Sequence, residues 1–408
     1  MWWHVANSKD AEQEIKSADY PNIRFWDANS SPSQAGWLAH TPQKTVKAEW
    51  RITTPQTVKD FAATPYFFAH DLHQKLHIPV GIVHVAVPGV EIESFLSEEF
   101  IRVNLPQTIE NWEYKKKDYA EALKQYDAAH AAWQAQKSAA DKKREKAPDE
   151  PKAPIAPNMS PPGGLFNGMI YPTAPYTTKG FLWWQGESNT RRSLQYQILF
   201  PGLIQEWRHL WGEDDAPFLF VELANFMPRQ TRPSEDDLWP ALRDAQHAAL
   251  RLSNTYEIST IDILPDEEGF YNIHPKNKQL AGHRLYLAAI ANVYGEKNLV
   301  WIGPTYRLVD FKGILATVTF DQIGSGLTAK DGGELKGFAL AGSDRHFSWA
   351  DEAEIHGNTV VVNSKEVANP VAVRYGWANN PIGNLYNLEG LPAFPFRSDD
   401  WNLGIKEP

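Results

Sequence analysis

A glutamine and a glutamate follow an aromatic pair in the segment Trp183-Trp184-Gln185-Gly186-Glu187. The side-chain NH2 of Gln185 could donate a hydrogen bond to an oxyanion that forms during acyl transfer, and one such donor contributes about 3 kcal/mol of transition-state stabilisation. Gly186 would let the backbone turn sharply. An ordinary strand end with a polar cap has the same residue types, so this segment alone leaves both interpretations open.

A histidine stands in the segment Asn272-Ile273-His274-Pro275, just before a helical pattern. Proline is frequent in the first turn of a helix, so His274 is predicted in the loop that precedes it. Imidazole titrates near neutral pH and can serve as a general base. A histidine that caps or packs against the helix would fit the same position equally well.

A glycine closes the run Val85-Ala86-Val87-Pro88-Gly89. We expect Gly89 to end a buried strand and open a helix, where its backbone N–H could donate to an oxyanion. A plain strand-to-helix turn explains the same pattern.

Several other chemistries find no support in the sequence. The chain has no cysteine, which excludes disulfides, thiolate nucleophiles and thiolate metal sites. His70, His73 and His77 share a helical spacing but lack the glutamate of an HExxH site, which favours a packed or solvated face over a metal centre. The nucleophile elbow GxSxG and the GxGxxG and Walker loops are also missing from the sequence, so we predict neither metal nor cofactor.

Apolar runs alternate with helical patterns through the first 300 residues. This alternation predicts an α/β fold with a doubly wound parallel sheet. Ligands of such sheets bind at the carboxyl ends of the strands, and Gly89, Gln185 and His274 each follow a predicted strand. The predicted strands are 78–87, 180–184, 217–223 and 258–264, and the predicted helices are 196–211, 239–252 and 278–294.

Two further regions depart from this alternation. Residues 113–162 read as an insertion, with a long exposed helix or helical hairpin over 114–146 and an extended proline-rich stretch over 148–162. It could be a solvated insertion, a lid or a partner surface. From residue 300, short alternating runs at 314–320, 335–340, 359–362 and 371–375 predict an antiparallel β-sandwich. We therefore expect a first domain over 1–299 and a second over 300–408.

The composition restricts the possible partners. The net charge is −10 and no basic stripe is present, which argues against nucleic acid. No apolar run approaches the roughly 20 residues of a membrane-spanning helix. The 16 Trp and 15 Tyr suit a sugar-binding surface or a large aromatic core.

Taken together, three motifs resemble the sialate O-acetylesterase family. In chain order they are the glycine after a strand, the W-x-Q-G-E-S motif at 183–188 and the I-H-P-x-x-K motif at 273–278. The resemblance extends over nearly the whole chain outside 114–162. Its further segments are 19–24, 67–81, 165–170, 199–212, 218–226, 242–246, 324–327, 374–377, 384–387 and 391–392.

Such a resemblance implies a flavodoxin-like SGNH-hydrolase fold that removes acetyl groups from O-acetylated sugars. A serine would attack the acetyl carbonyl while a histidine relays the proton. By position, His274 matches the base, Gln185 the oxyanion amide and Gly89 the glycine of the oxyanion hole. Trp184 and Glu187 are expected near the substrate, although Glu187 could instead hold Gln185 or its loop.

The chain departs from the family at the nucleophile, which lies in a Gly-Gln-Ser-Asn-Met run. Met1 matches the last residue of that run, so the serine and its central strand would precede residue 1. The absence of that strand should leave apolar edges on both neighbouring strands. A misplaced start and a truncated, inactive relative both explain this. Ser188 could substitute for the missing nucleophile, but this alternative is less favoured than the other two.

Two more departures concern the residues that would assist the serine. Pro88 stands where relatives have glycine, and proline has no N–H to donate. Asn272 replaces the aspartate that would orient the histidine ring, and Asp262 or Asp266 could serve as the acid instead.

Two functions therefore remain as hypotheses: a carbohydrate O-acetylesterase whose nucleophile is missing from this chain, and an inactive glycan-binding or scaffold relative. The resemblance implies a secreted or periplasmic setting. The acetylated sugar and the oligomeric state stay open.

Overall fold

The computed structural model describes residues 1–28, 39–143, 145–154, 161–233, 237–264, 268–269 and 271–405. The chain forms two compact units. The first comprises Met1–Pro32, Lys47–Ile92 and Ala174–Pro408, and the second comprises Ser33–Val46 and Glu93–Thr173.

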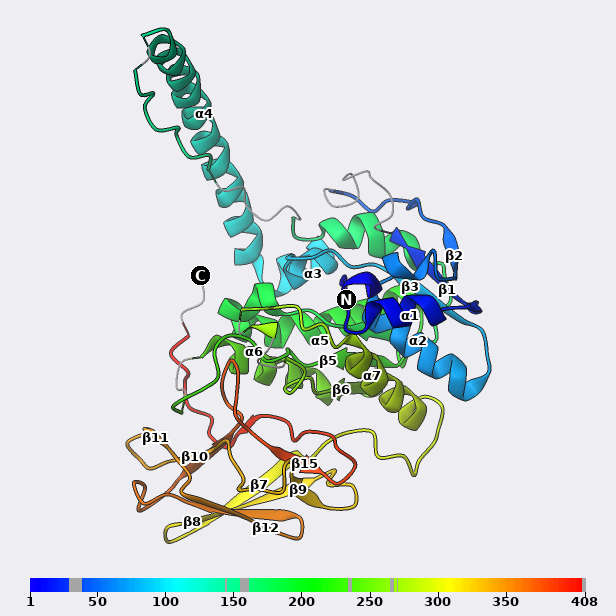
Figure 1. The fold of residues 1–408 in the computed structure, drawn as a ribbon, viewed down its shortest axis with the longest axis vertical. Coiled ribbons are helices and arrows are strands. Elements are labelled where there is room, and N and C mark those ends of the chain that lie inside the picture. Colours follow the sequence, from blue (N-terminus) through cyan, green and yellow to red (C-terminus); the bar gives the residue numbers. More distant parts are fainter. Residues whose placement is uncertain are drawn as a thin grey trace. The chain divides into compact units, whose positions relative to one another are not determined.

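The α/β part of the first unit contains two three-stranded sheets (Figure 1). In one, β1 (Tyr20–Asp27) pairs in parallel with β3 (Val80–His84) and antiparallel with β2 (Trp50–Thr53). In the other, β4 (Phe181–Trp183), β5 (Phe218–Val221) and β6 (Thr255–Ile258) are parallel and lie in that order. The parallel strands and their helices confirm the predicted α/β fold.

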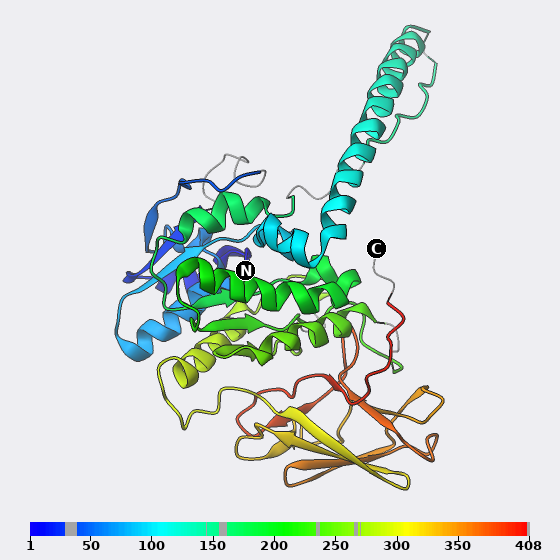
Figure 2. The same ribbon diagram turned by 180° about the vertical axis from the view of Figure 1, so that it is seen from behind.

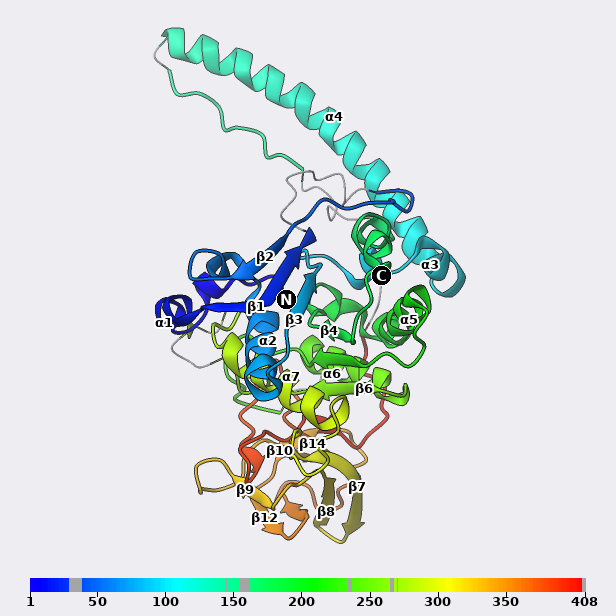
Figure 3. The same ribbon diagram turned by 90° about the vertical axis from the view of Figure 1, so that its right-hand side faces the viewer.

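Among the described residues, β3 and β4 are outer strands that each have one unpaired edge. Figure 3 shows β3 and β4 in neighbouring positions, and each is the outermost strand of its own sheet. Among the described residues, no strand pairs with either free edge. Ile82 of β3 and Leu182 of β4 are both partly exposed and pack against one shared apolar core.

Helices cover both faces of the second sheet because the side chains of a strand alternate between faces. Phe218 and Phe220 of β5 contact Phe200 of α5 (Ser193–Trp211) on one face. Leu219 and Val221 join the core formed with α2 (Ala63–Leu76) and α7 (Lys278–Asn292) on the other. All four β5 residues are buried, and full burial of such a side chain contributes about 1.5–3 kcal/mol.

Helices α2 and α7 approach each other closely at a glycine. A Cβ at Gly282 of α7 would lie 2.7 Å from Cβ of Phe67 in α2, which no real contact tolerates. The remaining helices of this part are α1 (Ala11–Ser17) and α6 (Leu238–His247), the latter followed by a 3-10 turn over Ala248–Arg251.

The second unit contains α3 (Glu98–Asn104) and α4 (Pro106–Lys143). Figure 2 shows α4 as one continuous helix, so the predicted helical hairpin is absent and the single helix is present. The following segment runs back along its far half, where Trp133 Nε1 donates to the Pro148 carbonyl at 2.8 Å. No described helix of the chain is long and apolar enough to cross a bilayer.

The C-terminal part is an antiparallel β-sandwich, as predicted. Its two four-stranded sheets have the orders β11-β10-β14-β16 and β12-β13-β8-β7, and β9 pairs with β15. Val318 and Val360 of one sheet and Leu340 and Val373 of the other meet in one core. The strands are β7 (Thr305–Lys312), β8 (Leu315–Asp321), β9 (Leu327–Ala329), β10 (Phe338–Ala341), β11 (Phe347–Trp349), β12 (Glu352–His356), β13 (Thr359–Asn363), β14 (Ala372–Tyr375), β15 (Leu385–Asn387) and β16 (Phe396–Arg397). The boundary at 299/300 stays a prediction.

One strand was predicted in the wrong place. The alternating segment 258–264 was expected to be a strand, but β6 occupies Thr255–Ile258. The polar residues of the segment instead build a turn: Ser259 Oγ accepts from the Ile261 N–H, and the Thr260 carbonyl accepts from the Ile263 N–H. Local hydrogen bonds of this kind compete with strand pairing.

Candidate active site

Gln185 follows β4 and is held by a hydrogen-bond network. Its Nε2 donates to Asn189 Oδ1 at 2.9 Å and to the Val90 carbonyl at 3.2 Å, and its Oε1 accepts from the Tyr196 hydroxyl at 3.1 Å. Asn189 is fully buried and also accepts from the Ile92 N–H at 3.0 Å. Both donors of the Gln185 amide thus face protein acceptors, and an oxyanion would have to displace the longer bond to Val90.

Gly89 lies in an exposed turn next to Val90, and the Val90 bond brings this turn to Gln185. The backbone of Gly89 has φ +72°, which favours glycine, while an added Cβ would meet nothing within 4 Å. The turn differs from the expected one. The strand ends at His84, and the next helical turn is a short 3-10 segment over Ile92–Phe95, so Gly89 neither closes the strand nor opens a helix.

His274 is exposed in the loop before α7, and its ring lies 5.1 Å from the Trp3 ring between centroids. Among the described residues, Asn272 forms no hydrogen bond with that ring. Its Oδ1 accepts from the backbone N–H of His274 at 2.9 Å, and its Nδ2 donates to Glu268 at 3.1 Å. Asn272 therefore shapes the loop backbone. In the part of the chain that the structure describes, the His274 ring has no hydrogen-bond partner, serine or otherwise.

Lys278 links His274 to the loop that follows β4. It is buried, and its Nζ lies 4.3 Å from the centroid of the Trp184 ring, a cation–π contact. Burial lowers the pKa of Lys278 to about 8, against the opposing charges of Glu187 and Glu268. Sequence reasoning did not assign Lys278 a role, although it is the last residue of the I-H-P-x-x-K motif and the first residue of α7.

The charges around His274 affect its protonation state. His274 is exposed as a residue, but neighbouring atoms partly desolvate its ring; this desolvation and then the positive charge of Lys278 lower the pKa of His274, whereas Glu187 raises it. A lowered pKa keeps the imidazole neutral at neutral pH, as a general base requires. Trp184 also contacts the start of the chain, because its carbonyl accepts from the Met1 amino group at 3.4 Å.

The candidate triad acid Asp262 is engaged elsewhere. It forms two bonds to Arg284, at 2.7 and 2.9 Å, and accepts from the Tyr386 hydroxyl at 3.0 Å. These partners lower the pKa of Asp262 although its burial would raise it. The other candidate, Asp266, lies outside the described residues.

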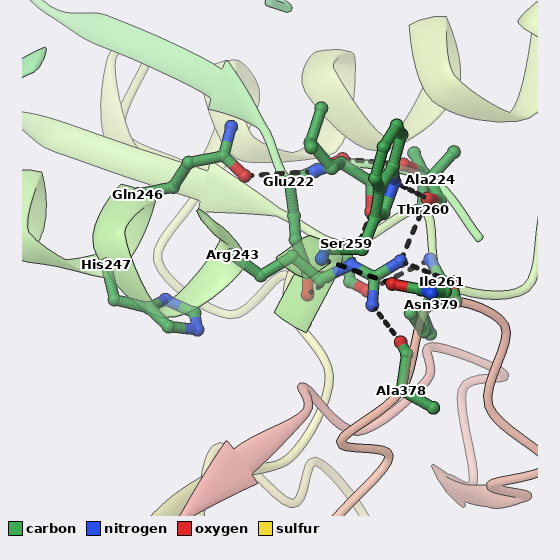
Figure 4. Close-up of polar contacts among 12 residues, drawn as sticks. Glu222, Ala224, Arg243, Gln246, His247, Ser259, Thr260, Ile261, Ala378 and Asn379 are labelled. Carbon is green, nitrogen blue, oxygen red and sulfur yellow. Dashed lines mark hydrogen bonds and ion pairs between the residues drawn. The ribbon is translucent and has the colours of Figure 1, made fainter. Parts of the chain in front are cut away.

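Buried polar residues lie next to the backbone of Gln185, and Figure 4 shows two of them, Gln246 and Arg243. Gln246 is fully buried; its Oε1 accepts from the Leu223 N–H at 3.0 Å, and its Nε2 lies 3.4 Å from the Gln185 carbonyl. One turn earlier, Arg243 donates to the carbonyls of Leu223 (2.8 Å), Ala224 (2.9 Å), Ala378 (2.7 Å) and Asn379 (3.1 Å). Arg243 thereby connects the site to the β-sandwich.

Two buried carboxylates accompany these polar residues. Burial raises the pKa of Glu222 to about 7 despite Arg243, whose Nε lies 3.8 Å from Oε1. Glu257 bonds to His247; burial would lower the pKa of His247, but the charge of Glu257 raises it to about 9.

Two of the three histidines at helical spacing have separate side-chain partners. His70 bonds to Asp71 and Tyr20, at 3.1 Å each, and His73 bonds to the Ile78 carbonyl at 2.6 Å. Within the described residues no group of histidine and carboxylate side chains could hold a metal ion.

Comparisons with known proteins show a matching family and a shared fold. A family profile described as carbohydrate esterase, sialic acid-specific acetylesterase, matches residues 163–290, a range that includes Gln185, Glu187 and His274. The structure of a carbohydrate acetylesterase from Xanthomonas citri aligns with 98% of this chain and 78% of its own, with a TM-score of 0.78 and 32% identity. This chain belongs to the sialate O-acetylesterase family.

Curated members of the family show the same relationship. Sialate O-acetylesterase of Mus musculus is 34% identical over 268 residues, which are 59% of this chain and 48% of the mouse protein. The Homo sapiens protein is 33% identical over 261 residues, 57% of this chain and 48% of the human protein. The chain thus spans about half the length of the curated relatives it matches.

Proposed function

We propose that this protein hydrolyses O-acetyl esters of carbohydrates by a serine–histidine mechanism. The observation that carries the proposal is the family fold with Gln185 and His274 on loops at the carboxyl ends of its parallel strands. Esterases of this chemistry need a base, oxyanion donors and a nucleophile.

In this mechanism a serine hydroxyl attacks the acetyl carbonyl and passes its proton to His274. Gln185 Nε2 and the backbone N–H of Gly89 stabilise the oxyanion. His274 then protonates the departing sugar hydroxyl, which leaves an acetyl-serine. Water, deprotonated by His274, attacks that ester and releases acetate and free serine.

The nucleophile in this proposal comes from residues outside the 408 of this chain. Two observations support it: the His274 ring has no serine partner among the described residues, and the facing edges of β3 and β4 are unpaired. A strand that paired with both edges would end at the same rim as Gln185. Ser188 lies in the 3-10 segment Glu187–Arg192 after β4 and shows no bond to His274.

Acetate release from an aryl acetate tests this mechanism. We expect no turnover by the 408-residue chain and turnover by a chain extended upstream through the Gln-Ser-Asn run. His274→Ala should abolish activity of the extended chain, whereas His356→Ala, at an exposed site on β12, should not. Turnover by the extended chain that survives His274→Ala would refute the assignment of the base.

A second candidate function, glycan binding without catalysis, is favoured by Pro88 and by the occupied amide of Gln185. Proline offers no N–H to an oxyanion. Glycan binding by calorimetry, with no acetate release even from the extended chain, would support this candidate over the first.

A further inference from the structure

A pocket of 890 Å³ lies where the loop after β5 meets the β-sandwich. It is lined by residues 227–233 and 237 of that loop, by residues of the sandwich, and by the C-terminal segment 401–404. Its volume is that of a small-molecule site. None of Gly89, Gln185 or His274 lines it, so it is separate from the candidate active site.

The lining of this pocket is strongly basic. It includes Arg229, Arg232, Arg345 and Arg374, whereas Asp237 is the single acidic residue among the described lining residues. This composition contrasts with a chain whose net charge is −10. A cluster of one sign in a concave site attracts ligands of the opposite charge.

Within the described residues, not all of these positive charges have an acidic partner. Arg374 forms a two-bond pair with Asp399, at 2.8 Å each. Arg232 and Arg345 are exposed, and in the described part of the chain neither forms an ion pair. Two guanidinium groups therefore remain available to an anion.

The arrangement of the arginines suits a planar anion. The guanidinium of Arg345 lies 5.3 Å from the Trp401 ring centroid and is free of an acidic partner among the described residues, whereas that of Arg374, 4.2 Å from the Phe347 ring centroid, is held by Asp399. Stacking restricts the orientation of the guanidinium plane, whose paired N–H groups match the two oxygens of a carboxylate.

The other lining groups suit a sugar. Trp401 offers an aromatic ring, and Gln230 Oε1 is a buried acceptor with no hydrogen-bond partner in the described residues. An unsatisfied buried acceptor is costly, and a ligand hydroxyl would satisfy it.

We propose that this pocket binds a carboxylate-bearing sugar unit, such as a uronate of an acidic glycan. The sugar assignment rests in part on the proposed function, whereas the anion assignment rests on the arginines alone. The site would hold an acidic residue of the glycan away from the acetyl group that is removed.

Calorimetry of the 408-residue chain with glucuronate, glucose and inorganic phosphate tests the proposal. We expect glucuronate to bind at least about tenfold more tightly than glucose, because each charge-assisted hydrogen bond contributes on the order of one such factor. Arg232→Ala and Arg345→Ala should each weaken glucuronate binding about tenfold. Arg345→Lys keeps the positive charge but loses the paired N–H groups of the guanidinium, so it should weaken binding less. Arg251→Ala, at an exposed residue outside the pocket, is the control.

The outcomes separate the alternatives. Equal binding of glucose and glucuronate, no binding of either, or an equal loss in Arg251→Ala would overturn the proposal. If inorganic phosphate binds as tightly as glucuronate and displaces it, the pocket binds anions without recognising the sugar. That result would overturn the sugar assignment. Since acetate release is not a readout here, failure of the proposed esterase function would leave the result of this experiment intact.

Discussion

The Asn189 side-chain oxygen accepts hydrogen bonds from the Gln185 amide and from the Ile92 backbone N–H, at 2.9 and 3.0 Å. A fully buried residue thus ties the loop after β4, which carries the candidate oxyanion donor, to the segment that follows β3. The two sheets are connected here although no strand pairing in the described part of the chain joins them.

Replacement of Asn189 by alanine should destabilise the protein. It would leave two donors without their acceptor, and together they should cost between about 2 and 4 kcal/mol in the free energy of unfolding. Urea denaturation measures this change. Asn189→Asp keeps the acceptor oxygens and should cost less. A loss as large in Asn189→Asp as in Asn189→Ala would contradict the assigned role of the oxygen.

The pKa of His274 should respond in opposite directions to two neighbouring charges. Lys278→Met removes a positive charge that lowers this pKa, so the pKa should rise; Glu187→Gln removes a negative charge, so it should fall. NMR titration of the histidine ring measures both shifts, with His274→Ala to identify the signal. Shifts of the same sign in the two variants would show that His274 does not sense these charges. In an active, extended chain, Lys278→Met should move the acidic limb of kcat/KM to higher pH, because the base must be neutral.

Arg243→Leu should be among the most damaging substitutions in the chain. It would leave Glu222 buried without its cation and would remove the bonds that join the site to Ala378 and Asn379. Breaking a buried pair in this way costs about 3–5 kcal/mol. Urea denaturation measures the loss, and adding Glu222→Gln to Arg243→Leu should recover part of it. If the double variant is no more stable than Arg243→Leu, the buried charge of Glu222 is not the source of the lost stability. Arg243→Lys keeps the positive charge and should lower the free energy of unfolding less than Arg243→Leu.

Glu222 should make stability depend on pH. Its pKa is about 7 in the folded protein and 4.5 as the ordinary value. Protonation is favoured in the folded state, so the contribution of this group is fully present below pH 4.5 and is lost as the pH rises through 7. The free energy of unfolding should therefore decline between pH 5 and pH 8, and Glu222→Gln should remove roughly 2 kcal/mol of that decline.

Unfolding measured at both pH values tests this prediction. The exposed Glu354→Gln serves as the control and should retain the decline of the parent protein. An unchanged decline in Glu222→Gln would mean that other groups produce it.

Much of the fold follows from local patterns in the sequence. The apolar run at 217–223 predicts β5 because a strand buried on both faces needs apolar residues at every position, and Phe218–Val221 is that strand. The helix predicted over 278–294 is present as Lys278–Asn292, with the Asn277 side chain capping its first turn. The order of the motifs around Gly89, Gln185 and His274 was enough to indicate the family. Their catalytic roles stay predictions.

Only the tertiary structure decided the partners of these residues. The family resemblance suggested that Asn272 orients the His274 ring, but its oxygen binds the loop backbone and its amide binds Glu268. Asp262 faces Arg284 and Tyr386, the latter 124 residues away in sequence. The basic pocket likewise joins Arg232 to Arg345 and Trp401. Periodicity and propensity act over a few neighbouring residues, so they specify strands and helices; which distant side chains meet depends on how those elements pack.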